Sequence, residues 1–140
     1  PKVLPNALAM MALNQFNKLE KFNTHRQKIA DYYSENLKST KFILPQKFNN
    51  RENAFLRFTV EHKDAHCIIY VAWHKQNILL GDWYTTVIAP FDTKMEEMHY
   101  TPGSCPNAEY LARSTLNLPT HINISQKDAE RIVNFLTSYK

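Results

Sequence analysis

Residues 104–121 have the sequence SCPNAEYLARSTLNLPTH, which predicts a helix directly before a strand. Proline suits the first position of a helix, where its missing N–H is not needed, so Cys105-Pro106 predicts a helix start. Leu116–Pro119 then predicts an extended segment. A helix that leads straight into a strand is typical of a small sheet covered by helices.

A second helix is predicted downstream of this stretch. Ser125 and Asp128 have the spacing of a capping box, although Asp replaces the usual Glu or Gln. Apolar residues follow at helical spacing, namely Ala129, Ile132, Val133 and Leu136. The chain is therefore expected to end in a helix that packs on the core.

Alternating strands and helices are also predicted upstream. Residues 54–60 are rich in aromatic and β-branched residues and predict a strand. Asp64 is expected to cap a helix that ends at Asn77, and Ile78-Leu79-Leu80 predicts a short buried strand. The expected core face of that helix is Ala65, Ile68, Ile69 and Ala72. The alternation predicts an α/β or α+β fold, with a small sheet covered by helices.

One long amphipathic helix is predicted over residues 1–40, where apolar residues recur mostly at steps of three and four. Asn23-Thr24 is the expected position of a break, because both side chains compete for backbone hydrogen bonds. We expect a single domain over residues 1–140, with the long helix in 1–40 and the α/β part in 41–140.

Composition limits the function classes. Of the 140 residues, 44% are hydrophobic, so the chain can bury a core, and the net charge is +4. The cations are scattered among acidic residues rather than clustered, which argues against nucleic acid as a partner. No apolar run is long enough to cross a bilayer, and Pro1–Pro5 does not resemble the start of a signal peptide. We therefore expect a soluble, cytoplasmic protein with no membrane partner.

The histidines and cysteines offer only weak candidates for chemistry. His62 and His66 have a metal-ligand spacing, but no third ligand is near in sequence, so we expect surface histidines and no metal site. Cys67 is expected to be buried beside the core face of its helix, and Cys105 to be a free thiol at a helix start. No catalytic residue is assigned.

The best site candidate is the corner Gly81-Asp82-Trp83-Tyr84, where a strand end presents a carboxylate and two aromatic rings. Such a group can stack on a ligand and form hydrogen bonds with it. The alternative is an aromatic plug over the core, and both interpretations stay open. Gly81 and Gly103 are the only glycines, so the chain has no glycine-rich loop for a phosphate.

Two motifs resemble the DegT/StrS sugar aminotransferases. The family has a C-P-x-A-E helix followed by an L-P-T-H strand, which are matched here within 105–109 and 118–121. The opening Leu4-Pro5-Asn6-Ala7-Leu8-Ala9 and the later Asn14-Gln15 and Leu19 also resemble the family's segment that enters the small domain. The resemblance covers essentially the whole chain but only the C-terminal small domain of the family's architecture, a small, mostly antiparallel sheet of the fold-type I aminotransferases.

The resemblance implies a parent enzyme that uses pyridoxal phosphate to transfer an amino group, with glutamate as donor, to a nucleotide-linked keto sugar. It implies a homodimer whose N-terminal large domain supplies the cofactor lysine, so this chain alone is expected to bind no cofactor and to be inactive. It also implies that Asp82, Trp83 and Tyr84 lie near the sugar, with Asn6 as a weaker candidate. Many relatives carry a histidine-centred motif where this chain has Trp83-Tyr84.

Two other function classes remain open. The chain could be a stand-alone, non-catalytic interaction module whose first helix docks a partner. It could also be a small hydrolase that uses Asp82 or Cys105. A domain separated from a larger fold often exposes the apolar surface that contacted its missing partner, so the stripe Leu8, Ala12, Phe16 and Leu19 is expected to cause self-association.

Overall fold

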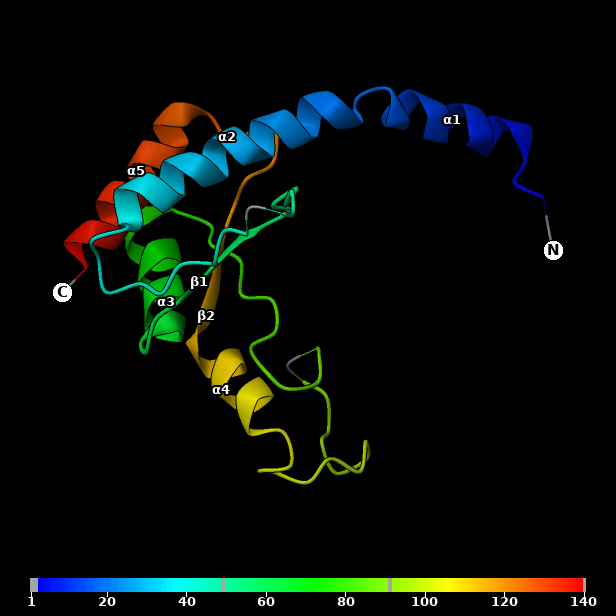
Figure 1. Cartoon of the computed structure of the whole chain (residues 1–140). Coiled ribbons are helices and arrows are strands. Elements are labelled where there is room, and N and C mark those ends of the chain that lie inside the picture. Colours follow the sequence, from blue (N-terminus) through cyan, green and yellow to red (C-terminus); the bar gives the residue numbers. More distant parts are fainter. Residues whose placement is uncertain (1–2, 49, 91, 140) are drawn as a thin grey trace.

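The computed structural model describes residues 3–48, 50–90 and 92–139, so Pro1 and Lys2 of the opening segment lie outside the described residues. The elements follow one another as shown in Figure 1. In chain order they are α1 (Asn6–Phe16), α2 (Leu19–Leu37), β1 (Phe58–Glu61), α3 (Ala65–Gln76), α4 (Pro106–Ser114), β2 (Thr115–Leu118) and α5 (Gln126–Ser138). No described helix combines the length and the apolar character that crossing a membrane requires.

The N-terminal helix is broken, but not where the sequence predicts. α1 ends at Phe16 and α2 begins at Leu19, whereas Asn23 and Thr24 lie inside α2. The predicted break at Asn23-Thr24 is therefore wrong. Asn23 Oδ1 accepts a hydrogen bond of 3.4 Å from Arg26 Nη1 one turn later, so its side chain is occupied within the helix instead of competing for the backbone.

The two N-terminal helices differ in burial. α1 has no buried residue and projects away from the rest of the chain (Figure 1). The C-terminal half of α2 packs on α5 and buries Ile29, Ala30, Tyr33 and Leu37. Only this half of the long helical region therefore belongs to the core.

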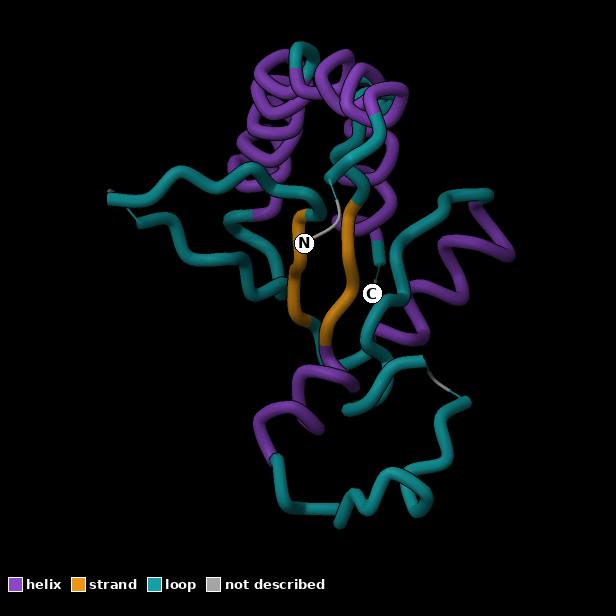
Figure 2. Tube along the Cα trace, turned by 90° about the vertical axis from the view of Figure 1, so that its right-hand side faces the viewer, coloured by secondary structure: helices purple, strands orange, loops and turns teal. Residues whose placement is uncertain are grey.

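The sheet consists of β1 and β2, which pair antiparallel with Phe58 opposite Leu118 and Val60 opposite Leu116. These four side chains are all buried and form the centre of the core with α2, α3 and α5. Figure 2 shows the two strands side by side among the helices. The helix-covered antiparallel sheet confirms the predicted fold class.

One predicted strand is shorter than expected, and another does not form. The first begins at Phe58 instead of Ala54, because Phe55 adopts a positive φ of 47° that interrupts the extended backbone. Residues 78–80 form no strand, and only Gly81 bridges to β2. Ile78 and Leu80 are nevertheless buried, and Leu79 between them is exposed, as in an extended segment with one face on the core.

The helix signals were mostly correct. Ser125 Oγ accepts a hydrogen bond from the Asp128 N–H at 3.2 Å, and Asp128 Oδ2 accepts one from the Ser125 N–H at 2.9 Å, which confirms the capping box. Asn77 ends α3, as predicted, and adopts a left-handed conformation. Asp64 precedes α3, but its side chain makes no capping hydrogen bond, so that prediction was wrong; its N–H instead donates to His62 Nδ1.

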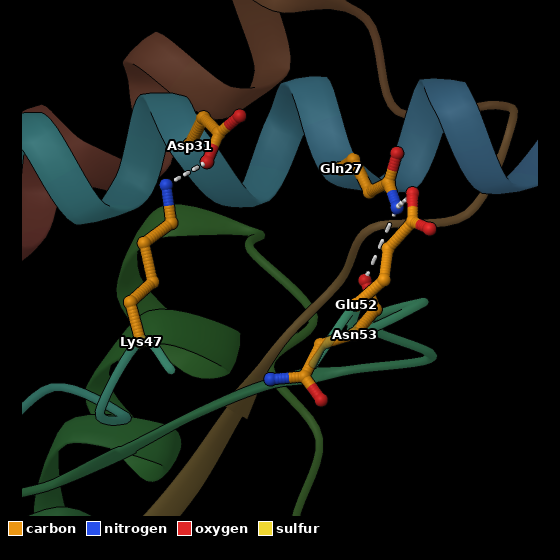
Figure 3. Close-up of polar contacts among 5 residues, drawn as sticks. All are labelled: Gln27, Asp31, Lys47, Glu52 and Asn53. Atoms are coloured by element: carbon orange, nitrogen blue, oxygen red, sulfur yellow. Dashed lines mark hydrogen bonds and ion pairs between the residues drawn. The ribbon is translucent and has the colours of Figure 1, made fainter. Parts of the chain in front are cut away.

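The loop before β1 is tied to α2 by polar contacts (Figure 3). Lys47 Nζ lies 2.6 Å from Asp31 Oδ1, and the hydrogen bond and charge of that carboxylate raise the pKa of Lys47. Gln27 Nε2 donates to Glu52 Oε1 at 2.9 Å and to the Asn53 carbonyl at 3.4 Å. These contacts fix the path of the chain toward β1.

The C-P-x-A-E motif within 105–109 and the L-P-T-H motif within 118–121 both have structural roles. Glu109 Oε1 accepts hydrogen bonds from the Tyr100 hydroxyl and the Gly103 N–H, which lower the pKa of Glu109 and tie the preceding loop to α4. Thr120 is fully buried, and its hydroxyl lies 2.6 Å from the Phe55 carbonyl oxygen and donates to it. The Tyr33 hydroxyl donates to the Pro119 carbonyl at 3.0 Å. The end of β2 is therefore linked both to α2 and to the segment before β1.

Replacing Tyr33 by Phe should destabilise the chain by about 1–2 kcal/mol, because the buried Pro119 carbonyl loses its donor. Burial raises the pKa of Tyr33 well above its ordinary value, so the hydroxyl stays a donor over the accessible pH range. The free energy of unfolding in urea measures the loss. Tyr32→Phe is the matched control, since the Tyr32 hydroxyl has no hydrogen-bond partner among the described residues, and equal losses in both variants would contradict the prediction.

The chain should self-associate through the stripe Leu8, Ala12, Phe16 and Leu19, all of which are exposed. Light scattering should show a mass that rises with concentration, and Leu8→Gln with Phe16→Gln should remove the rise. Met10→Gln is the control, because Met10 is also exposed but lies on the opposite side of α1. A wild-type monomer at high concentration would contradict this expectation.

Candidate functional site

The candidate site begins where the chain crosses the free edge of β2. The Gly81 N–H donates to the Asn117 carbonyl at 2.8 Å, and the Asn117 N–H donates to the Gly81 carbonyl at 3.1 Å. A Cβ atom on Gly81 would lie 3.0 Å from Asn117 Cβ, which is tighter than ordinary packing. The close approach to β2 therefore favours glycine at this position.

The residues after Gly81 leave the sheet and surround a hollow. Asp82, Trp83 and Tyr84 are exposed and line a cavity of about 470 Å³ together with Thr85, Thr86, Ala89 and Pro90. Tyr84 has a positive φ of 65°, an uncommon conformation for a residue with a side chain. The carboxylate and the two aromatic side chains thus surround one space, as the ligand-binding interpretation requires.

Trp83 is oriented by an arginine from another part of the chain. The guanidinium carbon of Arg57, just before β1, lies 4.8 Å from the centre of the Trp83 ring, a cation–π arrangement. Trp83 keeps half of its surface exposed, so the ring remains accessible. Arg57 was not identified from the sequence, because nothing local relates it to a tryptophan 26 positions later.

The polar face of the sheet adjoins the same hollow. Thr59 Oγ1 donates to Asn117 Oδ1 at 2.6 Å across the two strands. A second hollow of about 340 Å³ is bounded by both residues and shares Tyr84 and Thr86 with the first. The sequence signal for this face was the alternation of Thr59 with Phe58 and Val60, and of Asn117 with Leu116 and Leu118.

Asn6 does not join this group. It is exposed at the first turn of α1, the helix that projects away from the sheet (Figure 1). Within the described residues, the structure therefore brings together Asp82, Trp83 and Tyr84 but leaves Asn6 apart from them.

Two expectations about histidine and cysteine were wrong. His62 is buried instead of exposed, because its ring packs 4.9 Å from Phe42 and 6.4 Å from Tyr139. Cys67 is exposed instead of buried, because α3 turns Ala65 and Ile68 toward the core. Across residues 3–48, 50–90 and 92–139, no group of three or more histidine, cysteine or acidic side chains could hold a metal ion.

The described residues do not fit pyridoxal phosphate. Every lysine in this part of the chain is exposed, whereas a lysine that reacts with a carbonyl compound is usually activated in a desolvated pocket. The Gly81 N–H is used by Asn117 and the Gly103 N–H by Glu109, so neither glycine is free to bind a phosphate. The cofactor cannot be assigned to these side chains.

Comparison with known proteins identifies the family. The model of the DegT/DnrJ/EryC1/StrS aminotransferase family matches residues 3–137. The chain belongs to this family. Asp82, Trp83 and Tyr84 are therefore residues of a DegT-type fold.

A relative with a named activity matches most of the chain. The chain is 25% identical over 130 residues to the UDP-N-acetyl-3-dehydro-alpha-D-glucosamine 3-aminotransferase of Acidithiobacillus ferrooxidans. The match covers 91% of this chain but 34% of the relative. The chain thus spans about a third of the length of this relative.

Solved structures confirm the DegT-type fold. A DegT DnrJ EryC1 StrS aminotransferase from Brucella abortus has a TM-score of 0.73 and 24% identity, over 89% of this chain and 32% of its own. A protein from Streptococcus pneumoniae, described as a sugar aminotransferase and solved in a PLP form, has a TM-score of 0.78 and 17% identity, over 90% of this chain and 33% of its own. Both structures are matched over only a third of their length.

Gly81→Ala should shift the 81–84 segment, because the added Cβ meets Asn117, and should cost about 1–3 kcal/mol of stability. The emission of Trp83, isolated in a Trp73→Phe background, should change with it. Gly103→Ala is the control, since Gly103 has a φ of +86° but open space around it. That variant should lose stability through backbone strain and leave Trp83 emission unchanged. Unchanged emission in Gly81→Ala would contradict the assignment.

Proposed function

We propose that this chain forms the C-terminal small domain of an enzyme that transfers an amino group from glutamate to the keto group of a nucleotide-linked sugar. The observation that carries the proposal is the family match over residues 3–137, which accounts for nearly the whole chain. The relative from Acidithiobacillus ferrooxidans, whose name specifies a UDP-linked keto sugar, supports the substrate class. The enzyme would act as a homodimer in the cytoplasm.

Amino transfer in this enzyme would depend on pyridoxal phosphate, which acts as an electron sink when bound. Because the described residues lack a buried lysine and a free phosphate-binding glycine loop, the cofactor would be held by a large domain outside this chain. This chain by itself would then be inactive. Its contribution would be to shape the substrate side of the active site.

The corner of Asp82, Trp83 and Tyr84 would contact the sugar. Aromatic faces suit the apolar C–H surface of a sugar ring, and a carboxylate accepts hydrogen bonds from its hydroxyl groups. The support is the shared hollow and the half-exposed Trp83 ring. Asn6 would act only if the large domain brought α1 against the substrate.

A second candidate is a stand-alone interaction module with the same fold. The observation that favours it is α1, which carries exposed apolar side chains and no buried residue. The intact mass of the protein translated from the native gene separates the two candidates. A mass about three times that of this chain supports the aminotransferase, because the chain covers 34% of its relative. A mass equal to that of the chain supports the module.

Pyridoxal phosphate mixed with this chain should give no saturable visible absorbance of a lysine-bound cofactor and no turnover of a keto sugar with glutamate. The reason is that every described lysine is exposed. The full-length product of the gene, treated in the same way, is the positive control. A stoichiometric lysine adduct with turnover in the 140-residue chain would contradict the proposal that a large domain outside this chain holds the cofactor.

A further inference from the structure

A cation covers one face of the Trp83 ring. The guanidinium carbon of Arg57 lies 4.8 Å from the ring centre. Trp83 nevertheless keeps 50% of its surface exposed, so the face that Arg57 does not cover remains open. Trp83 lines the hollow of about 470 Å³, whereas Arg57 is not among the residues that line it. The ring therefore separates the guanidinium from the space that a ligand would occupy.

The backbone that carries Arg57 is fixed to the core. The Thr120 hydroxyl donates to the carbonyl oxygens of Phe55 and Leu56, the two residues before Arg57, at 2.6 and 3.1 Å. Directly after Arg57, β1 begins with the fully buried Phe58. The side chain of Arg57 is itself half-buried. Its charge is therefore held beside Trp83 by a rigid part of the chain.

Asp82 places a negative charge in the same hollow. Its side chain is exposed and lines the hollow next to Trp83. No ion pair within the described residues includes Asp82 or Arg57. A carboxylate next to an open aromatic face is a favourable environment for an organic cation. Without Arg57, this corner would therefore attract an ammonium group.

Arg57 opposes that attraction. An aromatic face attracts a cation through the electron density of the ring, and the guanidinium already uses this attraction at Trp83. A second cation on the open face would be repelled by the first across the ring, in a half-buried place where charges are screened less than in bulk water. A neutral sugar stacks through its C–H groups and carries no net charge for the guanidinium to repel. The Arg57–Trp83 pair thus disfavours cations and still admits a neutral sugar.

We propose that Arg57 is a specificity-determining residue that makes the Trp83 corner prefer an uncharged sugar over a sugar with an ammonium group. This proposal rests on the proposed function. Amino transfer converts a keto group, which is neutral, into an amine, which is positively charged when protonated. Arg57 would therefore weaken the binding of the amino-sugar product relative to that of the keto-sugar substrate, which favours release of the product.

The test compares two matched probes on the 140-residue chain. Methyl glucoside is uncharged, and methyl glucosaminide is used at a pH where its amine is protonated. NMR titration of the Trp83 indole N–H signal, in a Trp73→Phe background, gives both affinities. Arg57→Gln should strengthen the binding of methyl glucosaminide by about threefold to tenfold and change that of methyl glucoside by less than about twofold. The gain should shrink as salt concentration rises.

Three further variants separate charge from structure. Arg57→Lys keeps the charge and should keep the wild-type ratio of the two affinities, which a purely steric role of Arg57 would not explain. Adding Asp82→Asn to Arg57→Gln should remove the gain, because the carboxylate then no longer attracts the amine. Arg51→Gln is the matched control, since Arg51 lies 5.3 Å from the centre of the Phe48 ring and does not line this hollow. Circular dichroism confirms that each variant is folded.

The outcomes distinguish this proposal from the proposed function. If both sugars bind but Arg57→Gln leaves the ratio of their affinities unchanged, the sugar contact stands and the specificity role of Arg57 fails. Equal losses for both sugars in Arg57→Gln would also overturn that role, because Arg57 would then only support the ring or contact the sugar directly. If neither sugar binds to the wild-type chain, the proposed sugar contact of Trp83 fails together with the specificity.

Discussion

The buried hydrogen bond from the Tyr33 hydroxyl to the Pro119 carbonyl holds α2 against the chain that follows β2. It links α2 to the residue that follows β2, 86 positions later. Thr120 then joins the same loop to the segment before β1. Because a buried carbonyl without a donor is costly, these hydrogen bonds leave the three segments little freedom to separate.

The position of β2 between two neighbouring segments explains which residues form the candidate site. Asn117 pairs with Thr59 of β1 on one side and with Gly81 on the other, so β2 organises both neighbours although it has only four residues. The chain after Gly81 leaves the sheet with its aromatic residues next to the polar face. The Arg57–Trp83 contact then crosses from the start of β1 to this corner. A short strand thereby determines which side chains surround the hollow.

The family assignment and the structure agree on what this chain contributes. The chain spans about a third of its relatives, and its described residues provide aromatic, carboxylate and basic side chains but no buried lysine. A sheet edge with aromatic side chains suits substrate recognition, whereas pyridoxal phosphate needs a lysine and a phosphate-binding loop. Recognition and cofactor chemistry would thus belong to different parts of the proposed enzyme.

Local patterns in the sequence predicted several features of this protein. Helical spacing and the Ser125–Asp128 capping box predicted α5, Asn77 predicted the end of α3, and the two motifs predicted the family. Each of these signals acts within a few residues, so it can be recognised without knowing what packs against it.

Only the tertiary structure decided the burial of His62, the exposure of Cys67, the side chains around Trp83 and the separation of Asn6 from them. The break between α1 and α2 and the single bridge at Gly81 also escaped local patterns. The reason is that the burial of a side chain and its polar partners depend on residues far apart in the sequence.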